Sequence, residues 1–370
     1  MKLTIAKAEL QRGLARIQSI VEKRNSMPIL ANALLDASDG KLEIAATDLE
    51  VGIRGSEAAE IETPGGLTVS AKKFFEIVRE LPDDRVQLEA TPNAYLEIQC
   101  ARARFTLAGT ASEEYPTLPV FSPERTVPVQ AAVLSSMIER TMYAASADET
   151  RYNLNGVYLE VLEDTGKIRM AATDGHRLAL VDRNLTSEVE GLSSGVIIPR
   201  KGLAELKRLV DEDDAEEIEL AFEGNNGLAR KGDVTLVMRL IEGEFPNYRQ
   251  VIPSEHAIAL TLPVDTITQA VRRVALLSSE RSRAVKFELA DSQLVISSNN
   301  PDLGDAREEL DIEYSGEPLS IGFNARYLQD ALTASHAKEI QLSFLDDLSP
   351  AKVTPTDDPD TLAVVMPMRI

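Results

Sequence analysis

The feature that most constrains the fold is a short phrase that occurs three times, at intervals of 126 residues. Its middle copy, 168–180, reads as two short apolar runs joined by a Thr-Asp-Gly turn, a pattern typical of a β-hairpin. An earlier copy lies at 42–51 and a degenerate one at 294–303, and the equivalent turn positions are Thr47, Thr173 and Asn299. Only the middle copy continues as Gly-His-Arg-Leu, so we expect a repeated scaffold with special chemistry in one copy.

The same order of elements surrounds each copy of the phrase. A short strand precedes a first helix, the hairpin follows, and a second helix leads into further strands. The first helices are predicted at about 7–24, 130–146 and 263–279, and the second at 71–81, 200–210 and 324–334. Units of about 120 residues are too long for solenoid repeats. Apolar residues alternate along the strands, which favours antiparallel sheets and an α+β fold.

Two proline-containing segments, at the ends of the first and second thirds, divide the chain into domains. Glu114-Tyr115-Pro116 in the first third matches Glu244-Phe245-Pro246 in the second. Proline disfavours helix and ends strands, so both segments are predicted to lead into linkers. The predicted domains are 1–125, 126–253 and 254–370.

Composition excludes several classes of function. The single cysteine, Cys100, cannot form an intrachain disulfide or a cysteine metal cluster, and the three histidines are about 80 residues apart, unlike metal ligands. No apolar run approaches the ~20 residues needed to span a bilayer, and no secretory segment is found. We therefore expect a cytoplasmic protein with no metal and no membrane partner.

Charge is distributed unevenly between the predicted helices and the rest of the chain. The six helical segments with their short flanks hold 20 Lys and Arg against 11 Asp and Glu, whereas the remainder holds 19 against 49. The formal net charge of −21 by itself argues against a nucleic-acid partner. If the helices line a common concave surface, however, that surface attracts a polyanion while the acidic exterior repels it. Duplex DNA would then bind without sequence preference, because its phosphates carry no sequence information.

Together these residues resemble a known family, the bacterial DNA polymerase III beta subunit, or replicative sliding clamp. The resemblance covers the whole chain. Its most specific segments are RYNLNG at 151–156, TDGHRL at 173–178, IPRKG at 198–202, EFPNYR at 244–249 and VVMPMRI at 364–370.

The resemblance implies a fold, an assembly and a set of partners. Each of three tandem domains has two helices packed on antiparallel sheets, and two protomers close head to tail into a six-domain ring around duplex DNA. Such a clamp is not an enzyme, has no cofactor, and is opened by a separate ATP-driven clamp loader. The implied partners are double-stranded DNA, the DNA polymerase III alpha subunit, the clamp loader, and other polymerases and repair proteins that carry clamp-binding peptides.

The resemblance also implies a pocket between the second and third domains, into which partners insert a short peptide of the Gln/Leu/Phe type. Carried over residue by residue, it comprises Leu154, Thr173, Gly175, His176, Arg177, Leu178, Pro246, Val251, Asn324, Tyr327, Leu348, Val364, Val365, Met366, Pro367, Met368 and Arg369. Methionine adapts to several ligand shapes, which suits a pocket with many clients. Gln250 stands where the family often has a basic residue, and Ser282 where an aromatic residue is known.

Two further surfaces follow from the resemblance. The residues expected to contact DNA are Arg24, Lys72, Tyr152, Arg200, Lys201, Arg272 and Arg273. Asn153 stands at a position where the family is known to have a second tyrosine. At the ring seam, an edge strand with Phe105 and Leu107 is expected to meet Leu276 and Leu277 of the partner subunit, with Lys73 pairing with Asp302 of the partner subunit. Because the two surfaces differ, the contact is heterologous and forms a ring only if its rotation closes.

Two alternatives remain open from the residues alone. One is a β-rich scaffold that collects peptide partners without forming a ring. The other is a hydrolase in which Asp174 and His176 act together, with the histidine as general base. No serine or cysteine nucleophile elbow accompanies that pair in the sequence, so no catalytic residue is predicted.

Overall fold

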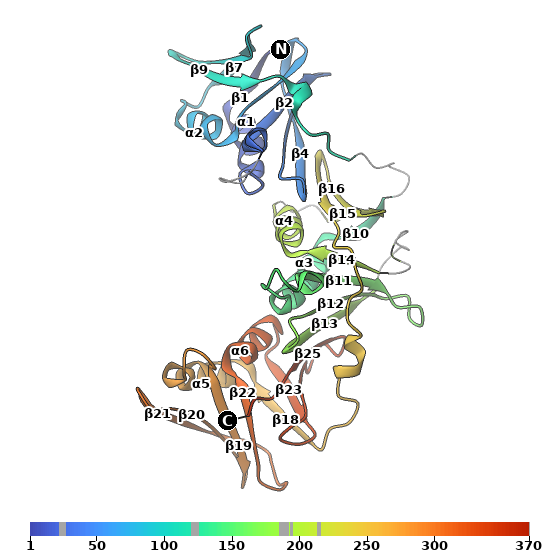
Figure 1. Cartoon of the computed structure of the whole chain (residues 1–370), viewed down its shortest axis with the longest axis vertical. Helices are drawn as coiled ribbons and strands as arrows, with labels where there is room; N and C mark the ends of the chain where they lie inside the picture. The colour runs from blue at the N-terminus through green and yellow to red at the C-terminus, as the bar shows by residue number, and fades with distance from the viewer. Residues whose placement is uncertain (22–26, 120–125, 185–191, 193–194, 213–215, 370) are drawn as a thin grey trace. The chain divides into compact units, whose positions relative to one another are not determined.

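A computed structural model describes residues 1–21, 27–119, 126–184, 192, 195–212 and 216–369 (Figure 1). The chain forms two compact units. Unit 1 is built mainly of Met1–Ala131 and Ala204–Leu240, and unit 2 mainly of Ala132–Thr186, Leu192–Leu203 and Ile241–Ile370. Within the described ranges, no helix has the length and apolar character that crossing a membrane requires.

Unit 1 holds one large antiparallel sheet. Among the described residues its 13 strands run in the order β10-β15-β16-β17-β4-β3-β2-β6-β9-β8-β7-β1-β5. Their bounds are β1 Lys2–Ala6, β2 Asn32–Ser38, β3 Lys41–Thr47, β4 Val51–Ala58, β5 Glu60–Thr63, β6 Gly65–Ser70, β7 Arg85–Ala90, β8 Tyr95–Cys100, β9 Ala103–Thr110, β10 Val127–Gln130, β15 Glu217–Glu223, β16 Asn226–Lys231 and β17 Val234–Arg239. The pairing of β4 with β17 joins the first third of the chain to the second.

Unit 2 holds two antiparallel sheets. The larger runs β14-β11-β12-β13-β25-β24-β23-β18 and the smaller β21-β20-β19-β22. Their bounds are β11 Gly156–Val161, β12 Ile168–Thr173, β13 Arg177–Arg183, β14 Val196–Pro199, β18 Ile258–Pro263, β19 Ala284–Ala290, β20 Gln293–Asn300, β21 Gly304–Asp311, β22 Leu319–Asn324, β23 Glu339–Phe344, β24 Ala351–Pro355 and β25 Thr361–Val365. The pairing of β13 with β25 repeats, one third later, the pairing of β4 with β17.

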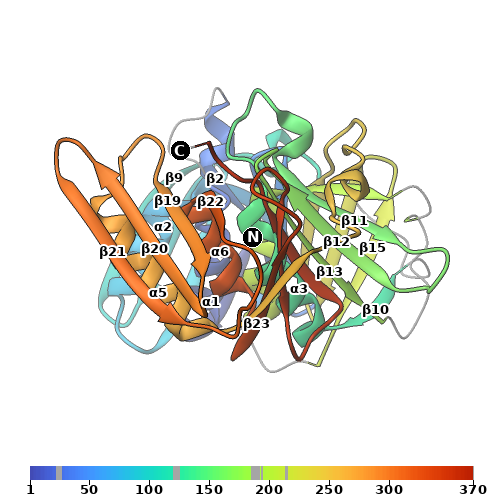
Figure 2. The ribbon, with the colours of Figure 1, turned by 90° about the horizontal axis from the view of Figure 1, so that it is seen from below.

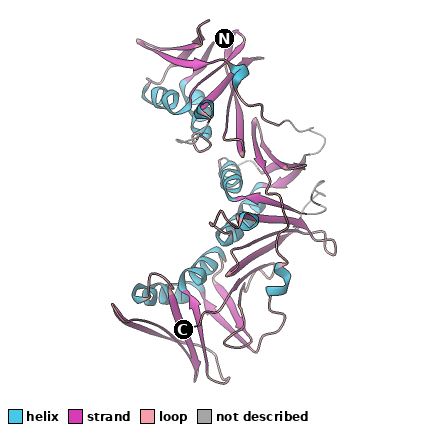
Figure 3. Ribbon diagram, in the orientation of Figure 1, coloured by secondary structure: helices cyan, strands magenta, loops and turns pink. Residues whose placement is uncertain are grey.

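Six α-helices appear in the described residues, two for each third of the chain. They are α1 Lys7–Ile17, α2 Ala71–Glu80, α3 Ala131–Thr141, α4 Arg200–Asp211, α5 Val264–Val274 and α6 Ala325–Ala334. In unit 1, α1 and α2 lie side by side against the strands (Figure 3). In unit 2, α5 and α6 pack together behind the smaller sheet (Figure 2). The α+β class, the antiparallel sheets and the approximate positions of the six helices are as the sequence predicts.

The first helix of each third is shorter than predicted. Helix α3 ends at Thr141 where the prediction ran to 146, and α5 ends at Val274 where it ran to 279; each is followed by a 3₁₀ turn. The sequence predicts a helix over 7–24, but α1 ends at Ile17, and residues 22–26 lie outside the described ranges. The carbonyl of Ile17 accepts hydrogen bonds from the amides of Ile20, at 3.1 Å, and Val21, at 3.3 Å. This tightened turn buries Ile20 completely, so tertiary packing overrides the helical periodicity that continues in the sequence.

Helix α2 shows how capping and core packing fix a helix. The Ser70 hydroxyl oxygen accepts a hydrogen bond from the Lys73 amide at 3.4 Å, which caps the N-terminus. Phe74 follows in the first turn and is fully buried, so it is one of the largest side chains in the interior of unit 1.

Replacing Phe74 with alanine should therefore lower the free energy of unfolding of unit 1 by about 3–5 kcal/mol, because the substitution leaves a cavity in a closely packed core. Urea unfolding followed by circular dichroism measures the loss. The control is Leu49→Ala, since Leu49 is 52% exposed and its truncation should have little effect. Equal destabilisation by the two variants would contradict the core assignment.

Candidate functional site

The predicted hairpin turn in unit 2 is held by two polar side chains. The Thr173 hydroxyl donates to the Arg177 carbonyl at 2.6 Å and accepts from the Gly175 amide at 3.1 Å. The Asp174 carboxylate accepts from the amides of His176, at 2.9 Å, and Arg177, at 3.1 Å. Gly175 has a φ of +87°, where glycine is favoured. These bonds fix the end of β12 and the start of β13.

Beside this turn lies an apolar cavity of about 230 Å³. Its walls come from Leu154, from the β12–β13 turn, from the segment that follows Glu244, and from strand β25 with the residue after it. The lining residues are Leu154, Thr173, Gly175, Arg177, Leu178, Pro246, Asn247, Tyr248, Val251, Val364 and Met366. The structure thus brings together nine of the residues predicted for the partner pocket, from four separate stretches of chain.

Tyr248 is a lining residue that the sequence-based list missed. It is buried, its hydroxyl donates to the Glu160 carboxylate, and burial raises its pKa to about 12. Arg169 in turn donates to the Tyr248 hydroxyl at 3.3 Å. Tyr248 lies within the recognised EFPNYR segment, so that motif could have indicated it. Asn247, from the same segment, was missed as well.

A second cavity, of about 790 Å³, adjoins the first through Met366, which lines both. It contains the predicted residues Leu348, Met366, Pro367, Met368 and Arg369, and four others that the sequence did not indicate: Lys286, Ser320, Gly322 and Asp347. The Met368 amide donates to the Gly322 carbonyl at 2.7 Å, so the C-terminal tail, the segment from Met366 onward, is hydrogen-bonded to strand β22. The two cavities together form what we call the tail groove.

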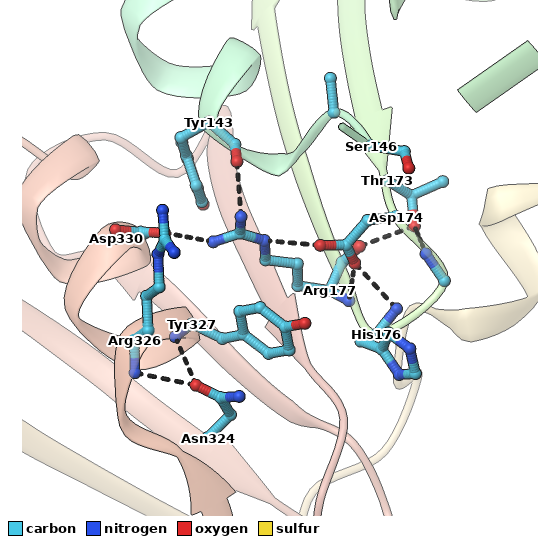
Figure 4. A network of polar contacts seen from close by, with 12 residues as sticks. Tyr143, Ser146, Thr173, Asp174, His176, Arg177, Asn324, Arg326, Tyr327 and Asp330 are labelled. Atoms are coloured by element: carbon cyan, nitrogen blue, oxygen red, sulfur yellow. Dashed lines mark hydrogen bonds and ion pairs between the residues drawn. The ribbon is translucent and has the colours of Figure 1, made fainter. Parts of the chain in front are cut away.

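Arg177 stands at the centre of a polar network on the wall of the tail groove (Figure 4). Its Nε donates to Asp174 at 3.0 Å, its Nη1 to Asp330 at 2.5 Å, and its Nη2 to the Tyr143 carbonyl at 2.7 Å. The guanidinium carbon lies 4.6 Å from the centroid of the Tyr327 ring, within cation–π range. Elements β13, α6 and the segment after α3 therefore meet at one side chain.

The remaining predicted pocket residues have different positions. The His176 ring stacks on Tyr327, with centroids 6.2 Å apart. Asn324 caps α6 by accepting from the amides of Arg326 and Tyr327. Val365 is fully buried and belongs to the hydrophobic core of unit 2, so its side chain lines neither cavity. Neighbouring residues of a strand face opposite sides, which explains why Val364 lines the cavity and Val365 does not.

The Asp174–His176 pair has the geometry of a turn. Both carboxylate oxygens of Asp174 accept hydrogen bonds from residues of the turn itself, including the Arg177 side chain. The carboxylate is thus used to hold the hairpin, and the His176 ring is directed to Tyr327. The arrangement serves the shape of the groove and gives no support to the hydrolase alternative.

The residues predicted to contact DNA differ in their exposure and in the bonds that they make within the protein. Arg272 is exposed on α5, and Tyr152 is 54% exposed with its hydroxyl bonded to the Glu242 carbonyl. Lys72 pairs with Glu76 at 3.8 Å, and Arg200 donates to the Ala145 carbonyl at 3.3 Å. Lys201 is half-buried at the start of α4, and Arg24 lies outside the described residues.

Arg273 and the basic face of α1 are partly neutralised within the protomer. Arg273 pairs with Glu308 of β21 at 2.5 Å. Arg12 and Arg16 both pair with Glu57, a carboxylate that is only 2% exposed, and the Arg16 side chain is itself largely buried. The sequence count of basic residues therefore overstates the positive charge that these helices present.

The predicted seam residues of β9 and of the end of α5 lie on exposed edges of the two units, whereas Lys73 lies on α2 and pairs with Glu76 at 2.8 Å. Strand β9 pairs with β6 only at Gly109 and Thr110, so one edge of its earlier part has no strand partner among the described residues. Phe105, on that part, is 39% exposed. Leu276 is 75% exposed, at the end of α5, and β21 is the last strand of the smaller sheet.

Comparison with known proteins gives matches over the full chain. Residues 1–119, 128–247 and 249–369 match, respectively, the N-terminal, central and C-terminal domains of the DNA polymerase III beta subunit. The chain is 39% identical to the beta sliding clamp of Caulobacter vibrioides and 34% identical to that of Escherichia coli K12, covering all of both proteins.

Solved structures agree with these matches. A Caulobacter crescentus beta sliding clamp crystallised with PEG bound to its putative beta-motif tethering region has a TM-score of 0.95 at 39% identity. The DNA polymerase III subunit beta of Pseudomonas aeruginosa has a TM-score of 0.94 at 34% identity, and both chains are covered completely. Fold and site thus define a three-domain sliding clamp. The chain belongs to the DNA polymerase III beta subunit family, whose members are non-catalytic processivity factors.

The Arg273–Glu308 pair gives a measurable electrostatic prediction. The hydrogen bond from Arg273 lowers the pKa of Glu308 below its ordinary value of 4.5. A lowered pKa in the folded state stabilises the protein above the unfolded pKa, and this contribution is lost as the pH falls through the folded value. Arg273→Ala should therefore raise the pKa of Glu308, as measured by NMR titration of its side-chain carboxyl carbon. Arg272→Ala is the matched control, and an equal shift in both variants would contradict the pairing.

Proposed function

We propose that this chain is a sliding clamp that closes as a homodimeric ring around duplex DNA and tethers the replicative polymerase to it. The tail groove carries the proposal, because it joins predicted partner-binding residues from four stretches of a chain that matches the family over its whole length. The clamp catalyses no reaction. It increases processivity because the polymerase cannot diffuse away from a ring that is linked topologically to its template.

The tail groove is the proposed binding site for partner peptides. The cavity beside the Thr173 turn is apolar and would take the leucine and phenylalanine side chains of a short Gln/Leu/Phe-type peptide. The adjoining cavity, with Met366 and Met368, would take the rest of the peptide. Unbranched thioether side chains adapt to different ligand shapes, which allows the polymerase alpha subunit, the clamp loader and repair polymerases to use one site.

Basic side chains are the proposed contacts to DNA. Arg24, Lys72, Arg200, Lys201, Arg272 and Arg273 would face the phosphates, with Tyr152 as an additional backbone contact. Because several of these cations are already paired with carboxylates or carbonyls, each phosphate contact would be weak. Weak contacts suit a ring that holds DNA by enclosure and must slide, since tight phosphate binding would impede movement.

The proposed seam joins the free edge of β9 in one protomer to the β21 edge and α5 end of its partner. Phe105 and Leu107 would pack against Leu276 and Leu277 of the partner subunit, and Lys73 would pair with Asp302 of the partner subunit. Covering both edges removes unpaired strand groups, and burying Leu276 removes an exposed apolar side chain. Two such contacts, related by rotation, close a ring.

Two further assignments complete the proposal. The domains would extend over 1–125, 126–253 and 254–370, with linkers after the two proline-containing segments. The protein would act in the cytoplasm, where bacterial DNA is replicated. Gln250 is exposed and precedes Val251, which lines the first cavity, whereas Ser282 lies before β19 and lines neither cavity.

Topological binding predicts a difference between circular and cut DNA. After loading by a clamp loader, the protein should stay on a nicked circular duplex during gel filtration and be lost when the circle is linearised. Leu276→Asp should abolish retention, because a charge at the seam opposes ring closure. Leu49→Asp is the control, since it places the same charge on an exposed leucine outside the seam. Equal retention on both DNA forms would favour a scaffold that does not encircle DNA.

Removal of the tail separates partner binding from assembly. Deleting residues 366–370 should reduce the affinity for a polymerase-derived peptide by more than about 100-fold, equivalent to at least ~2.7 kcal/mol. Fluorescence anisotropy measures the affinity for the peptide, and analytical ultracentrifugation should show that the dimer persists. A truncated chain that is monomeric would contradict the separate placement of groove and seam.

A further inference from the structure

Arg177 is a buried cation on the wall of an apolar cavity. Its side chain is only 10% exposed, yet it helps to line the cavity that is proposed to hold the leucine and phenylalanine of a partner peptide. A buried guanidinium is costly unless it is paired and hydrogen-bonded. The chain neighbour Asp174 supplies one carboxylate, at 3.0 Å, but that carboxylate also holds the hairpin turn.

The second carboxylate comes from a distant part of the sequence. Asp330, on α6, accepts from Arg177 Nη1 at 2.5 Å, and its side chain is 31% exposed. Nη2 donates to the Tyr143 carbonyl at 2.7 Å, so each of the three guanidinium nitrogens has a partner within the protein (Figure 4). Arg326 lies 3.9 Å from the same Asp330 carboxylate, so two arginines and two carboxylates balance, and the group as a whole presents no excess positive charge to a ligand.

We propose that Asp330 is a positioning residue that makes the tail groove selective for apolar over acidic side chains. It acts through Arg177, which it holds against the Tyr327 ring with its charge compensated. Without Asp330, Nη1 of Arg177 would lack its partner, and Asp174 alone would remain to balance Arg177 and Arg326. The group beside the cavity would then carry an excess positive charge and would attract a carboxylate on the ligand. The inference rests on the proposed function of the groove as a peptide site and adds a determinant of its specificity.

The experiment compares two fluorescent peptides of the Gln/Leu/Phe type that differ only by glutamate in place of leucine. Anisotropy titrations with the full-length dimer give the affinity ratio between them. In Asp330→Ala, the leucine peptide should bind about 5-fold more weakly and the glutamate peptide more tightly, so the ratio should fall by at least about 10-fold, or ~1.4 kcal/mol. Asp265→Ala is the matched control, because it removes an exposed carboxylate from α5 of the same unit.

A second variant separates charge from geometry. Asp330→Asn keeps an oxygen that can accept from Arg177 but removes the negative charge, so it should bind the leucine peptide within about 2-fold of the unchanged protein while the ratio still falls. It also replaces the alanine variant if that protein does not fold. An unchanged ratio in Asp330→Asn, or an equal loss for both peptides in Asp330→Ala, would overturn the inference.

Two further measurements distinguish this inference from the proposed function. In an Arg177→Ala background, the Asp330→Ala change should no longer alter the ratio, because the two residues act as one unit. Met366→Ala should weaken the leucine peptide regardless of Asp330. If Met366→Ala has no effect, the groove is not the peptide site and the proposed function fails. If Met366→Ala weakens binding but the affinity ratio is the same with and without Asp330, only the present inference fails.

Discussion

The structure depends on the hydrogen bonds of one turn, made by a threonine hydroxyl and an aspartate carboxylate. Thr47 and Asp48 in unit 1 form the same four bonds as Thr173 and Asp174 in unit 2, between 2.6 and 3.1 Å. The residue that follows has a positive φ in both turns, although it is Leu49 in one and glycine in the other. The side-chain bonds therefore impose the backbone, and the leucine accepts a strain of about 1–3 kcal/mol.

In unit 2 this turn lines the tail groove, whereas in unit 1 other side chains pack against the equivalent turn. In unit 1, Tyr115 is buried, and its hydroxyl accepts from the Thr47 amide at 3.0 Å and donates to the Asn32 carbonyl at 3.2 Å. Leu118 packs on Gly52 so closely that an added Cβ would lie 2.3 Å from it. Unit 2 has Phe245 at the position of Tyr115, without a hydroxyl to anchor it, and it stacks on Tyr158 instead.

Sequence periodicity could predict the scaffold but only part of the site. The 126-residue interval predicted the hairpins and the helix pairs, because turn chemistry and amphipathic faces are local properties. That Val365 faces away from the cavity lined by Val364 follows from strand alternation and could have been predicted from the sequence. The pairing of Arg273 with Glu308 could not, because the two residues meet only when α5 packs beside β21. Lys286 likewise reaches the groove only through the course of β19 along β22.

The position of α6 is the long-range condition on which the shape of the groove depends. Asn324 caps α6 with its side-chain oxygen and donates from its amide nitrogen to the Ser282 carbonyl at 3.3 Å. The helix thus placed brings Tyr327 and Asp330 to Arg177, which Asp174 already holds from the turn. Residue 282 takes part in this chain of contacts through its backbone carbonyl, so a serine there preserves the support of the groove.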